Sequence, residues 1–464
     1  LDAATPAVLR VDKTGFTRTL RTSVAATANA TVASRVMLLP VAVTLSFDAA
    51  QAAVLRVPGT TARVDLSAGS LVREDGQALS GAASVALTPI DPSTDVAQMP
   101  GLMVDAASGT PIESLGALAV TFTDATGAAL NLASGRSATI RIPAAPAAGA
   151  TLPATYPLYH LNETTGRWVQ EGTATLQTDV ATGAQYYEGT VTHFSVWNAD
   201  QEITRSSLVL GSDQSGAACT VQAGLRVVAE GIDYNGTSQP DSGQVIVRAN
   251  SRVRLLLLNG QGKALDVLEV NTAGAGGSVR PSRCLTQQAD VRLSGRVVVS
   301  SGSLSGYRVQ ISGAFPSFTL PIDGSGQYST PVYRDAGAVS ARLVRTDSRR
   351  DVPDTQVSTT IAGADVALPD LTVADTTVSV DGCLQGWADY RQGSAQVSIF
   401  RGNTLMAAPF TVSETSPAFA FAVPINSTLT LRITPPDASL AERSVEVVVG
   451  STPPDLGACL NLPR

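Results

Sequence analysis

One short segment holds residue types that can do chemistry. His193-Phe194-Ser195 places an imidazole base two positions before a serine hydroxyl, and no other His-Phe-Ser occurs in the chain. Attack of a serine hydroxyl on a peptide carbonyl needs a nucleophile, a base and backbone strain, and the sequence supplies only the first two. In the alternative interpretation His193 hydrogen-bonds the last strand, while Phe194 and Trp197 fill the core. The sequence alone leaves both open.

His160 is the only other histidine. It has no Asp, Glu or Cys at ligand spacing, so we expect an ordinary strand residue. With two histidines in the chain, a catalytic zinc site would need mostly carboxylates or thiols, and we expect no metal site and no cofactor. The acidic turns at 233–236 and 323–326 lack the multi-carboxylate spacing of calcium loops and are predicted to be plain turns. We therefore predict a non-enzymatic protein, self-cleavage excepted.

The four cysteines fit neither a metal-binding CxxC pattern nor a redox pair, and four cysteines allow three pairings. Pairing Cys219 with Cys284 and Cys383 with Cys459 would tie the start of one module to its end in each case. That arrangement favours an oxidising, extracytoplasmic compartment. Four buried free thiols are the alternative.

Composition points to many short strands. The 464 residues contain 5% aromatic and 15% charged residues together with 40 glycines, which favours strands and tight turns over helices. The predicted fold class is all-β, with tandem β-sandwich modules, Ig-like or regulatory-like, in an elongated multidomain rod. A net charge of −7 without a basic cluster argues against nucleic acid as a partner. No apolar run reaches the roughly 18–20 residues of a membrane span, and the start at Leu1 suggests a removed leader or earlier segment.

Turn signals and a recurring Cys-Leu punctuation divide the chain into five parts. We expect N-terminal strands over residues 1–48, a large β-sandwich domain over 49–203 that ends after the His-Phe-Ser motif, and three β-sandwich modules over 204–290, 291–382 and 383–464. Two strands are too few for an independent sandwich. Residues 1–48 must therefore pack on the next domain, on an absent upstream segment or on another molecule.

The fourth part resembles the carboxypeptidase regulatory-like module of bacterial surface proteins. That module has a "GxV" strand followed by "DxxGxY", and the matching residues here are Gly295, Val297, Asp323, Gly326 and Tyr328. Residues 383–464 resemble it more faintly. The resemblance implies a bacterial, extracellular β-sandwich.

The large domain resembles the bacterial extracellular β domain related to cartilage intermediate layer protein, and the autoproteolytic domains of netrin-receptor and zonula-occludens type proteins. Its landmarks here are Pro100-Gly101, Leu115-Gly116, Leu130-Asn131-Leu132, Gly135, Trp168, Glu171-Gly172 and His193-Phe194-Ser195. In the autoproteolytic relatives the serine attacks the preceding carbonyl with the histidine as base. The resemblance thus implies possible cleavage between Phe194 and Ser195.

Three functions follow as hypotheses. The first is a structural or adhesive protein of the bacterial cell surface or exterior. Its copies would polymerise by strand addition into a fibre or filament, that is, a homopolymer. Cell-surface or matrix components would be further partners. Strand-like runs lie at 7–11 and 36–45. Gly15-Phe16, followed by a strand that ends Leu39-Pro40-Val41, looks like the closing half of a regulatory-like module whose opening strands are missing. The unpaired edges of such a half-sandwich would invite a strand from a neighbouring subunit. The second is the self-cleaving surface protein. The third is a carbohydrate-binding accessory protein using Trp168, Trp197 or Trp387 as an aromatic platform.

Overall fold

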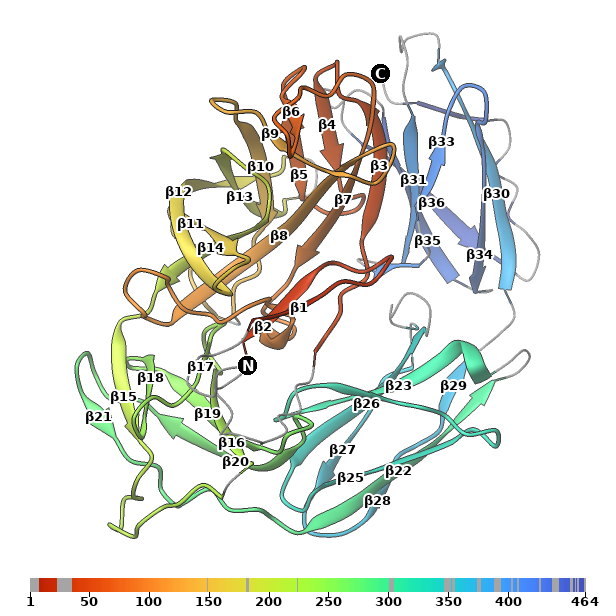
Figure 1. Cartoon of the computed structure of the whole chain (residues 1–464). Helices are drawn as coiled ribbons and strands as arrows, with labels where there is room; N and C mark the ends of the chain where they lie inside the picture. Colours follow the sequence, from red (N-terminus) through yellow and green to blue (C-terminus); the bar gives the residue numbers. More distant parts are fainter. Residues whose placement is uncertain are drawn as a thin grey trace.

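The protein is built of β-strands joined by turns (Figure 1). The computed structural model describes residues 8–22, 36–147, 149–180, 183–222, 224–299, 304–345, 352, 355–373, 377–387, 394–401, 404–406, 409–424, 427–435, 442–450, 454, 456 and 459–462. Within these residues the complete helical turns are the 3-10 turns η1 (Val96–Gln98) and η2 (Leu304–Gly306), and Trp387 also has a 3-10 conformation. The all-β class with tandem β-sandwich modules, predicted from the sequence, is confirmed. Among the described residues we find no helix with the length and apolarity to cross a membrane.

The large domain is organised around one twelve-stranded sheet. Its main path runs β3-β7-β8-β14-β11-β12-β13-β10-β5-β4, and β6 and β9 pair beside β8. The strands are β3 (Val43–Asp48), β4 (Ala53–Arg56), β5 (Arg63–Leu66), β6 (Leu71–Arg73), β7 (Ala82–Ile90), β8 (Ile112–Asp124), β9 (Ala129–Leu132), β10 (Ala138–Pro143), β11 (Thr155–Asn162), β12 (Arg167–Thr178), β13 (Gln185–Val191) and β14 (Val196–Glu202).

Strand β8 is buried almost throughout because both of its faces are covered. Leu118 and Phe122 point into the main core of the domain, whereas Ala117 and Ala119 face a second, smaller core on the other side of the sheet. Successive side chains of a strand point to opposite faces. A continuous apolar run therefore predicts a strand covered on both faces, as β8 is.

The smaller core is covered by a hairpin of β1 (Val8–Val11) and β2 (Thr19–Thr22). Leu20 is fully buried in it, and the guanidinium of Arg21 donates to the carbonyl oxygens of Ala97 and Met99 at 2.6 and 2.8 Å. The hairpin therefore packs on the large domain, which is the first of the three possibilities that the sequence left open. Residues 1–7 and 23–35 of the predicted N-terminal part lie outside the described residues.

Two predictions for this part are wrong. The strand expected over residues 36–45 begins only at Val43, because Pro40 has no N–H to donate to a ladder; Pro40 makes an isolated bridge with Phe16. The boundary expected at residue 48 also fails, since Val43–Asp48 pairs with β7 along its whole length and is part of the large sheet.

The next sheets form a sandwich. The three-stranded sheet has the order β18-β15-β21, and the four-stranded sheet has the order β17-β16-β19-β20. The strands are β15 (Arg205–Val209), β16 (Arg226–Gly231), β17 (Thr237–Ser238), β18 (Gln244–Arg248), β19 (Arg252–Leu258), β20 (Ala264–Asn271) and β21 (Ser278–Val279). The Cys219–Cys284 disulfide joins the two ends of this segment.

A further sandwich follows, with one sheet of order β25-β22-β28 to which β29 also pairs, and another of order β24-β23-β26-β27. Strand β19 of the previous sandwich contributes to two cores. Leu256 and Leu258 on one face pack into the core of this further sandwich, whereas Leu255 and Leu257 on the other face pack into the core of the previous sandwich. The two sandwiches therefore share a buried apolar contact. The strands are β22 (Asp290–Val299), β23 (Tyr307–Gly313), β24 (Phe318–Leu320), β25 (Gln327–Tyr333), β26 (Gly337–Arg345), β27 (Val357–Ile361), β28 (Val366–Ala367) and β29 (Leu371–Val373).

The C-terminal sandwich pairs a sheet of order β34-β30-β37 with a sheet of order β32-β31-β35-β36, to which β33 is added. Its strands are β30 (Thr377–Gln385), β31 (Ala395–Arg401), β32 (Thr404–Leu405), β33 (Phe410–Val412), β34 (Ala418–Pro424), β35 (Ser427–Thr434), β36 (Arg443–Val449) and β37 (Leu460–Asn461). This sandwich lies beside β3 and β4 of the large domain (Figure 1), and the ring of Phe400 lies against Gly59. Ser317 of the preceding sandwich donates to Asp95 of the large domain at 2.8 Å.

One tight turn recurs in three of these parts. In Asp124-Ala125-Thr126-Gly127, Asp213-Gln214-Ser215-Gly216 and Asp323-Gly324-Ser325-Gly326, the aspartate Oδ1 accepts from the hydroxyl and backbone N–H two positions on and from the N–H four positions on. The carboxylate thus replaces ladder hydrogen bonds at the turn. The acidic turn at 323–326 has this hydrogen-bonded form.

Candidate functional site

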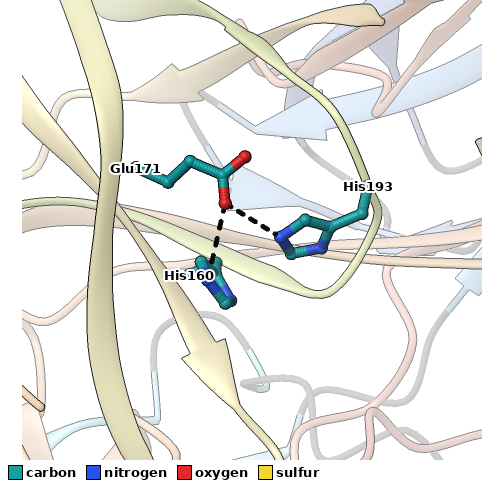
Figure 2. A group of neighbouring side chains, drawn as sticks. All are labelled: His160, Glu171 and His193. Carbon is teal, nitrogen blue, oxygen red and sulfur yellow. Dashed lines mark ion pairs between the residues drawn. The ribbon is translucent and has the colours of Figure 1, made fainter. Parts of the chain in front are cut away.

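Both histidines of the chain meet at one place in the large domain (Figure 2). His160 is in β11, Glu171 is in the neighbouring strand β12, and His193 is in the bend between β13 and β14. Each residue offers one ligand atom, and these three atoms all lie within 4.8 Å of one another. Figure 2 shows both imidazoles pointing toward the same carboxylate oxygen.

The distances identify that oxygen. Glu171 Oε2 lies 3.4 Å from His193 Nε2 and 3.6 Å from His160 Nε2. The other oxygen, Oε1, accepts a 2.6 Å hydrogen bond from the hydroxyl of Thr192. The carboxylate is therefore oriented by one oxygen and directed at both imidazoles by the other.

A β-bulge places Glu171. Pro157 pairs with Thr173 and Tyr159 pairs with Gln170, so the two residues Glu171 and Gly172 lie opposite the single residue between Pro157 and Tyr159. A bulge bends its strand and redirects side chains. Gly172 makes it possible because its φ of +91° is a conformation that favours glycine.

Trp197 supports both rings from the core side. Its ring centroid is 5.0 Å from that of His193 and 5.5 Å from that of His160, and the two imidazole centroids are 4.4 Å apart. Trp197 is fully buried and pairs with His160 in the register of β11 and β14. The imidazoles thus rest on a fixed aromatic surface, and the side chains of His160, His193 and Glu171 remain 16, 30 and 38% exposed.

The electrostatics favour a neutral imidazole beside a charged carboxylate. Burial lowers the pKa of His160 below its ordinary value, and the neighbouring His193 lowers it further. The hydrogen bond from Thr192 is the main cause that lowers the pKa of Glu171. Neutral imidazole and ionised carboxylate are the forms that bind metal ions.

The remainder of the His-Phe-Ser turn is held by Asn131. Its Oδ1 accepts from the Phe194 N–H at 2.7 Å, and its Nδ2 donates to the Phe194 carbonyl at 3.4 Å. The Phe194 ring is buried in the main core, as the structural interpretation of the sequence expected. The Ser195 hydroxyl donates to the carbonyl of Val196 at 3.2 Å. Within the described part of the chain, the non-glycine residues with a positive φ are Ser242 and Asn250. The His-Phe-Ser turn therefore contains no residue in this strained conformation.

The sequence reasoning missed the partner of His160. It predicted an ordinary strand residue because no acidic residue stands at ligand spacing along the same strand, but the carboxylate comes from the adjacent strand. The available signal was Glu171-Gly172, since a glycine inside a strand pattern indicates a bulge. The sequence led us to expect that a metal site would need mostly carboxylates or thiols, whereas this cluster has two histidines and one carboxylate.

The cysteines and the other two tryptophans predicted to matter are not among the residues of this cluster. Cys219 pairs with Cys284 and Cys383 pairs with Cys459, which are the two module-closing pairings expected from the sequence. The tryptophans predicted to form an aromatic platform are buried: Trp168 and Trp197 have no exposed surface, and Trp387 is 9% exposed. No tryptophan ring therefore faces solvent for a sugar to stack on.

Comparisons with known proteins gave distant likenesses only. No protein-family model matches the chain, and no curated protein matches it. Among solved structures, the Bacillus anthracis TIE protein aligns over 99% of this chain and 74% of its own, at 10% identity and a TM-score of 0.17. A streptococcal ancillary pilin aligns over 56% of this chain and 99% of its own, at 10% identity and a TM-score of 0.26. BcpA, the major pilin subunit of Bacillus cereus, aligns over 56% and 97%, at 8% identity and a TM-score of 0.14. TM-scores below 0.5 identify neither a common fold nor a function.

Proposed function

We propose that this chain is a non-enzymatic structural or adhesive protein of the bacterial exterior, a subunit that self-associates into a surface fibre or matrix. The observation that carries the proposal is the pair of disulfides, Cys219–Cys284 and Cys383–Cys459, each closing one module of a tandem array. Disulfides persist in oxidising compartments outside the cytoplasm. Covalently closed sandwiches in series suit a protein that must keep its shape outside the cell.

Assembly would use an open strand edge. Among the described strands, β1 pairs only with β2, so the backbone of Val8–Val11 has one unpaired edge. Leu9 on this strand is 41% exposed, which is high for a large apolar side chain. An exposed apolar edge accepts a strand from another molecule through backbone hydrogen bonds. The neighbouring subunit would add its strand here.

The test is self-association as a function of protein concentration. Leu9→Lys places a charge on the edge, which discourages strand addition while leaving the hairpin's own pairs in place. Val221→Lys is the matched control, because Val221 is similarly exposed at 47% but lies outside the described strands. We expect wild type and Val221→Lys to form oligomers or fibres in sedimentation and electron microscopy, and Leu9→Lys to remain monomeric. A wild-type chain that stays monomeric at every concentration contradicts the assembly, and equal assembly of Leu9→Lys contradicts this edge.

A second candidate function is self-cleavage at the His-Phe-Ser turn. The observation in its favour is the amide of Asn131, which donates to the carbonyl oxygen of Phe194, the carbonyl that Ser195 would attack. A donor at that oxygen stabilises the charge that develops on it. The Ser195 oxygen would bond to the Phe194 carbonyl carbon as the C–N bond breaks, the Ser195 nitrogen would take up the hydroxyl proton, and water would hydrolyse the resulting ester.

Denaturing electrophoresis with mass spectrometry tests this second candidate. Cleavage predicts two fragments that meet between Phe194 and Ser195 and that disappear in Ser195→Ala. Asn131→Leu should slow their appearance by about 100-fold, the size of effect seen when one such donor is removed. A single full-length species in the wild type after prolonged incubation rules the candidate out.

A further inference from the structure

The His160, Glu171 and His193 side chains converge on a point that none of them occupies. Both N–O separations, 3.4 and 3.6 Å, exceed the roughly 2.7–3.2 Å of ordinary N–H···O hydrogen bonds. They are close to the separation of two ligands on one zinc ion, which is about 3.3 Å for tetrahedral bonds of about 2.0–2.1 Å. These two separations therefore fit shared coordination better than direct pairing, and all three ligand atoms lie within 4.8 Å of one another.

The donor set selects the kind of ion. Two imidazole nitrogens and one carboxylate oxygen suit zinc and related divalent transition metals, whereas calcium and magnesium prefer oxygen ligands alone. Three protein ligands leave a fourth tetrahedral position for water, and the three side chains are partly exposed to solvent.

The surroundings have the features of a supporting shell. Thr192 holds Glu171 Oε1, which leaves Oε2 directed at the two imidazoles. The Trp197 ring packs at a tilt against both imidazoles, and its Nε1 donates to the carbonyl of His193. Metal ligands are commonly oriented by such outer contacts.

We propose that His160, Glu171 and His193 form a binding site for one zinc ion, with water as the fourth ligand. The ion would join the neighbouring strands β11 and β12 to the bend before β14, which follows them in the chain after β13. The site goes beyond the proposed surface role, since it would form in a single chain whether or not that chain assembles.

Metal titration of the full chain tests the site. After treatment with a chelator, the protein is titrated with Zn²⁺ in a calorimeter and with Co²⁺ in a spectrophotometer. We expect one Zn²⁺ per chain, a higher melting temperature with Zn²⁺, and the intense visible absorption of tetrahedral Co²⁺. Millimolar Ca²⁺ or Mg²⁺ should not displace either ion.

Variants distinguish the site from adventitious binding. His160→Gln and His193→Gln should each weaken Zn²⁺ binding by more than about 100-fold, beyond the effect of losing an outer contact. Glu171→Gln is the change least expected to disturb the fold, because the Glu171 side chain is partly exposed. It should abolish the tetrahedral Co²⁺ spectrum while the protein stays folded. The control Glu188→Gln removes a carboxylate of β13 that pairs with Arg141 and should bind Zn²⁺ as the wild type does.

Two results would overturn the proposal. One is the absence of stoichiometric Zn²⁺ binding by the wild type at millimolar Zn²⁺. The other is a Glu171→Gln or His193→Gln protein that is folded by circular dichroism and binds Zn²⁺ with unchanged affinity.

Discussion

The indole Nε1 of Trp197 donates a 3.0 Å hydrogen bond to the carbonyl oxygen of His193, four residues earlier in the chain. This contact closes the bend between β13 and β14 and holds the imidazole of His193 against the buried indole, with the ring centroids 5.0 Å apart. The segment from His193 to Trp197 therefore completes the hydrophobic core with Phe194 and Trp197 and leaves the side chain of His193 30% exposed. Core packing and site geometry are coupled at this bend.

The hydroxyl of Thr192 should act as a positioning group for Glu171. Thr192→Val removes the donor to Glu171 Oε1 but keeps the shape of the side chain, so the carboxylate loses its orientation. We expect Zn²⁺ affinity to fall by about 10-fold, the lower end of the effect of outer contacts. Thr192→Ser restores the hydroxyl and should restore affinity. The measurement is calorimetric titration of the three proteins, and equal affinities in all three would show that Thr192 has no such role.

The bulge at Gly172 should matter to zinc binding and not only to stability. Gly172→Ala puts a Cβ on a residue with φ of +91°, so the bulge must relax and Glu171 must shift. Gly127→Ala is a matched control, since its φ of +87° carries a similar strain in a remote turn with open space around the new methyl group. Each should lower the free energy of unfolding by about 1 kcal/mol or somewhat more.

Only Gly172→Ala should weaken Zn²⁺ binding. Urea denaturation measures the shared loss of stability, and Zn²⁺ titration measures the difference. Equal zinc affinities for the two variants would mean that the bulge does not set the position of Glu171.

The recurring aspartate turns predict a loss of stability in acid. The side-chain hydrogen bond from Ser325 is the main cause that holds the pKa of Asp323 below its ordinary value of 3.8, and corresponding bonds lower the pKa of Asp124 and Asp213. A carboxyl group whose pKa is lower in the folded state stabilises the fold fully above its unfolded pKa. That contribution disappears as the pH falls through the ordinary value toward the folded one.

Asp323→Asn tests this dependence because Asn259 makes the same backbone contacts in its own turn, accepting from the N–H groups of Gln261 and Lys263. The variant should fold, but its melting temperature should fall less steeply than that of the wild type between pH 5 and pH 2, where the carboxylate would titrate. Parallel pH profiles of the two proteins would contradict a stabilising role for the charged turn.

The Cys383–Cys459 disulfide should stabilise the C-terminal sandwich alone. It links residues 76 apart in sequence, and closing a loop of that size in the unfolded chain stabilises the fold by about 2–4 kcal/mol. The double variant Cys383→Ser/Cys459→Ser should lower the temperature of one calorimetric unfolding transition and leave the unfolding temperature of the large domain unchanged. The corresponding Cys219→Ser/Cys284→Ser variant should lower the temperature of a different unfolding transition. A single shared transition that shifts equally in both variants would mean that the sandwiches unfold as one unit.

Much of the architecture could be predicted from local patterns. Alternating apolar residues bounded by Asp-Gly and Ser-Gly turns predicted sandwich modules, because strand period and turn chemistry are written in adjacent residues. The positions of the cysteines indicated which module ends meet. The strand expected over 36–45 failed at Pro40, a local signal that the pattern should have included.

The sequence by itself determined which segments become strands, where the turns fall, and that His193, Phe194 and Ser195 stand together at the end of the large domain. Only the tertiary structure decided that His160 and Glu171 join His193. The pairing of β11 with β12 and β14, and the bulge at Glu171-Gly172, set which side chains share a face. Register is a property of strand pairing, and a slip of one residue moves every side chain to the opposite face. No spacing along a single strand records it, and for this reason the three residues stay unrelated until the sheet is formed.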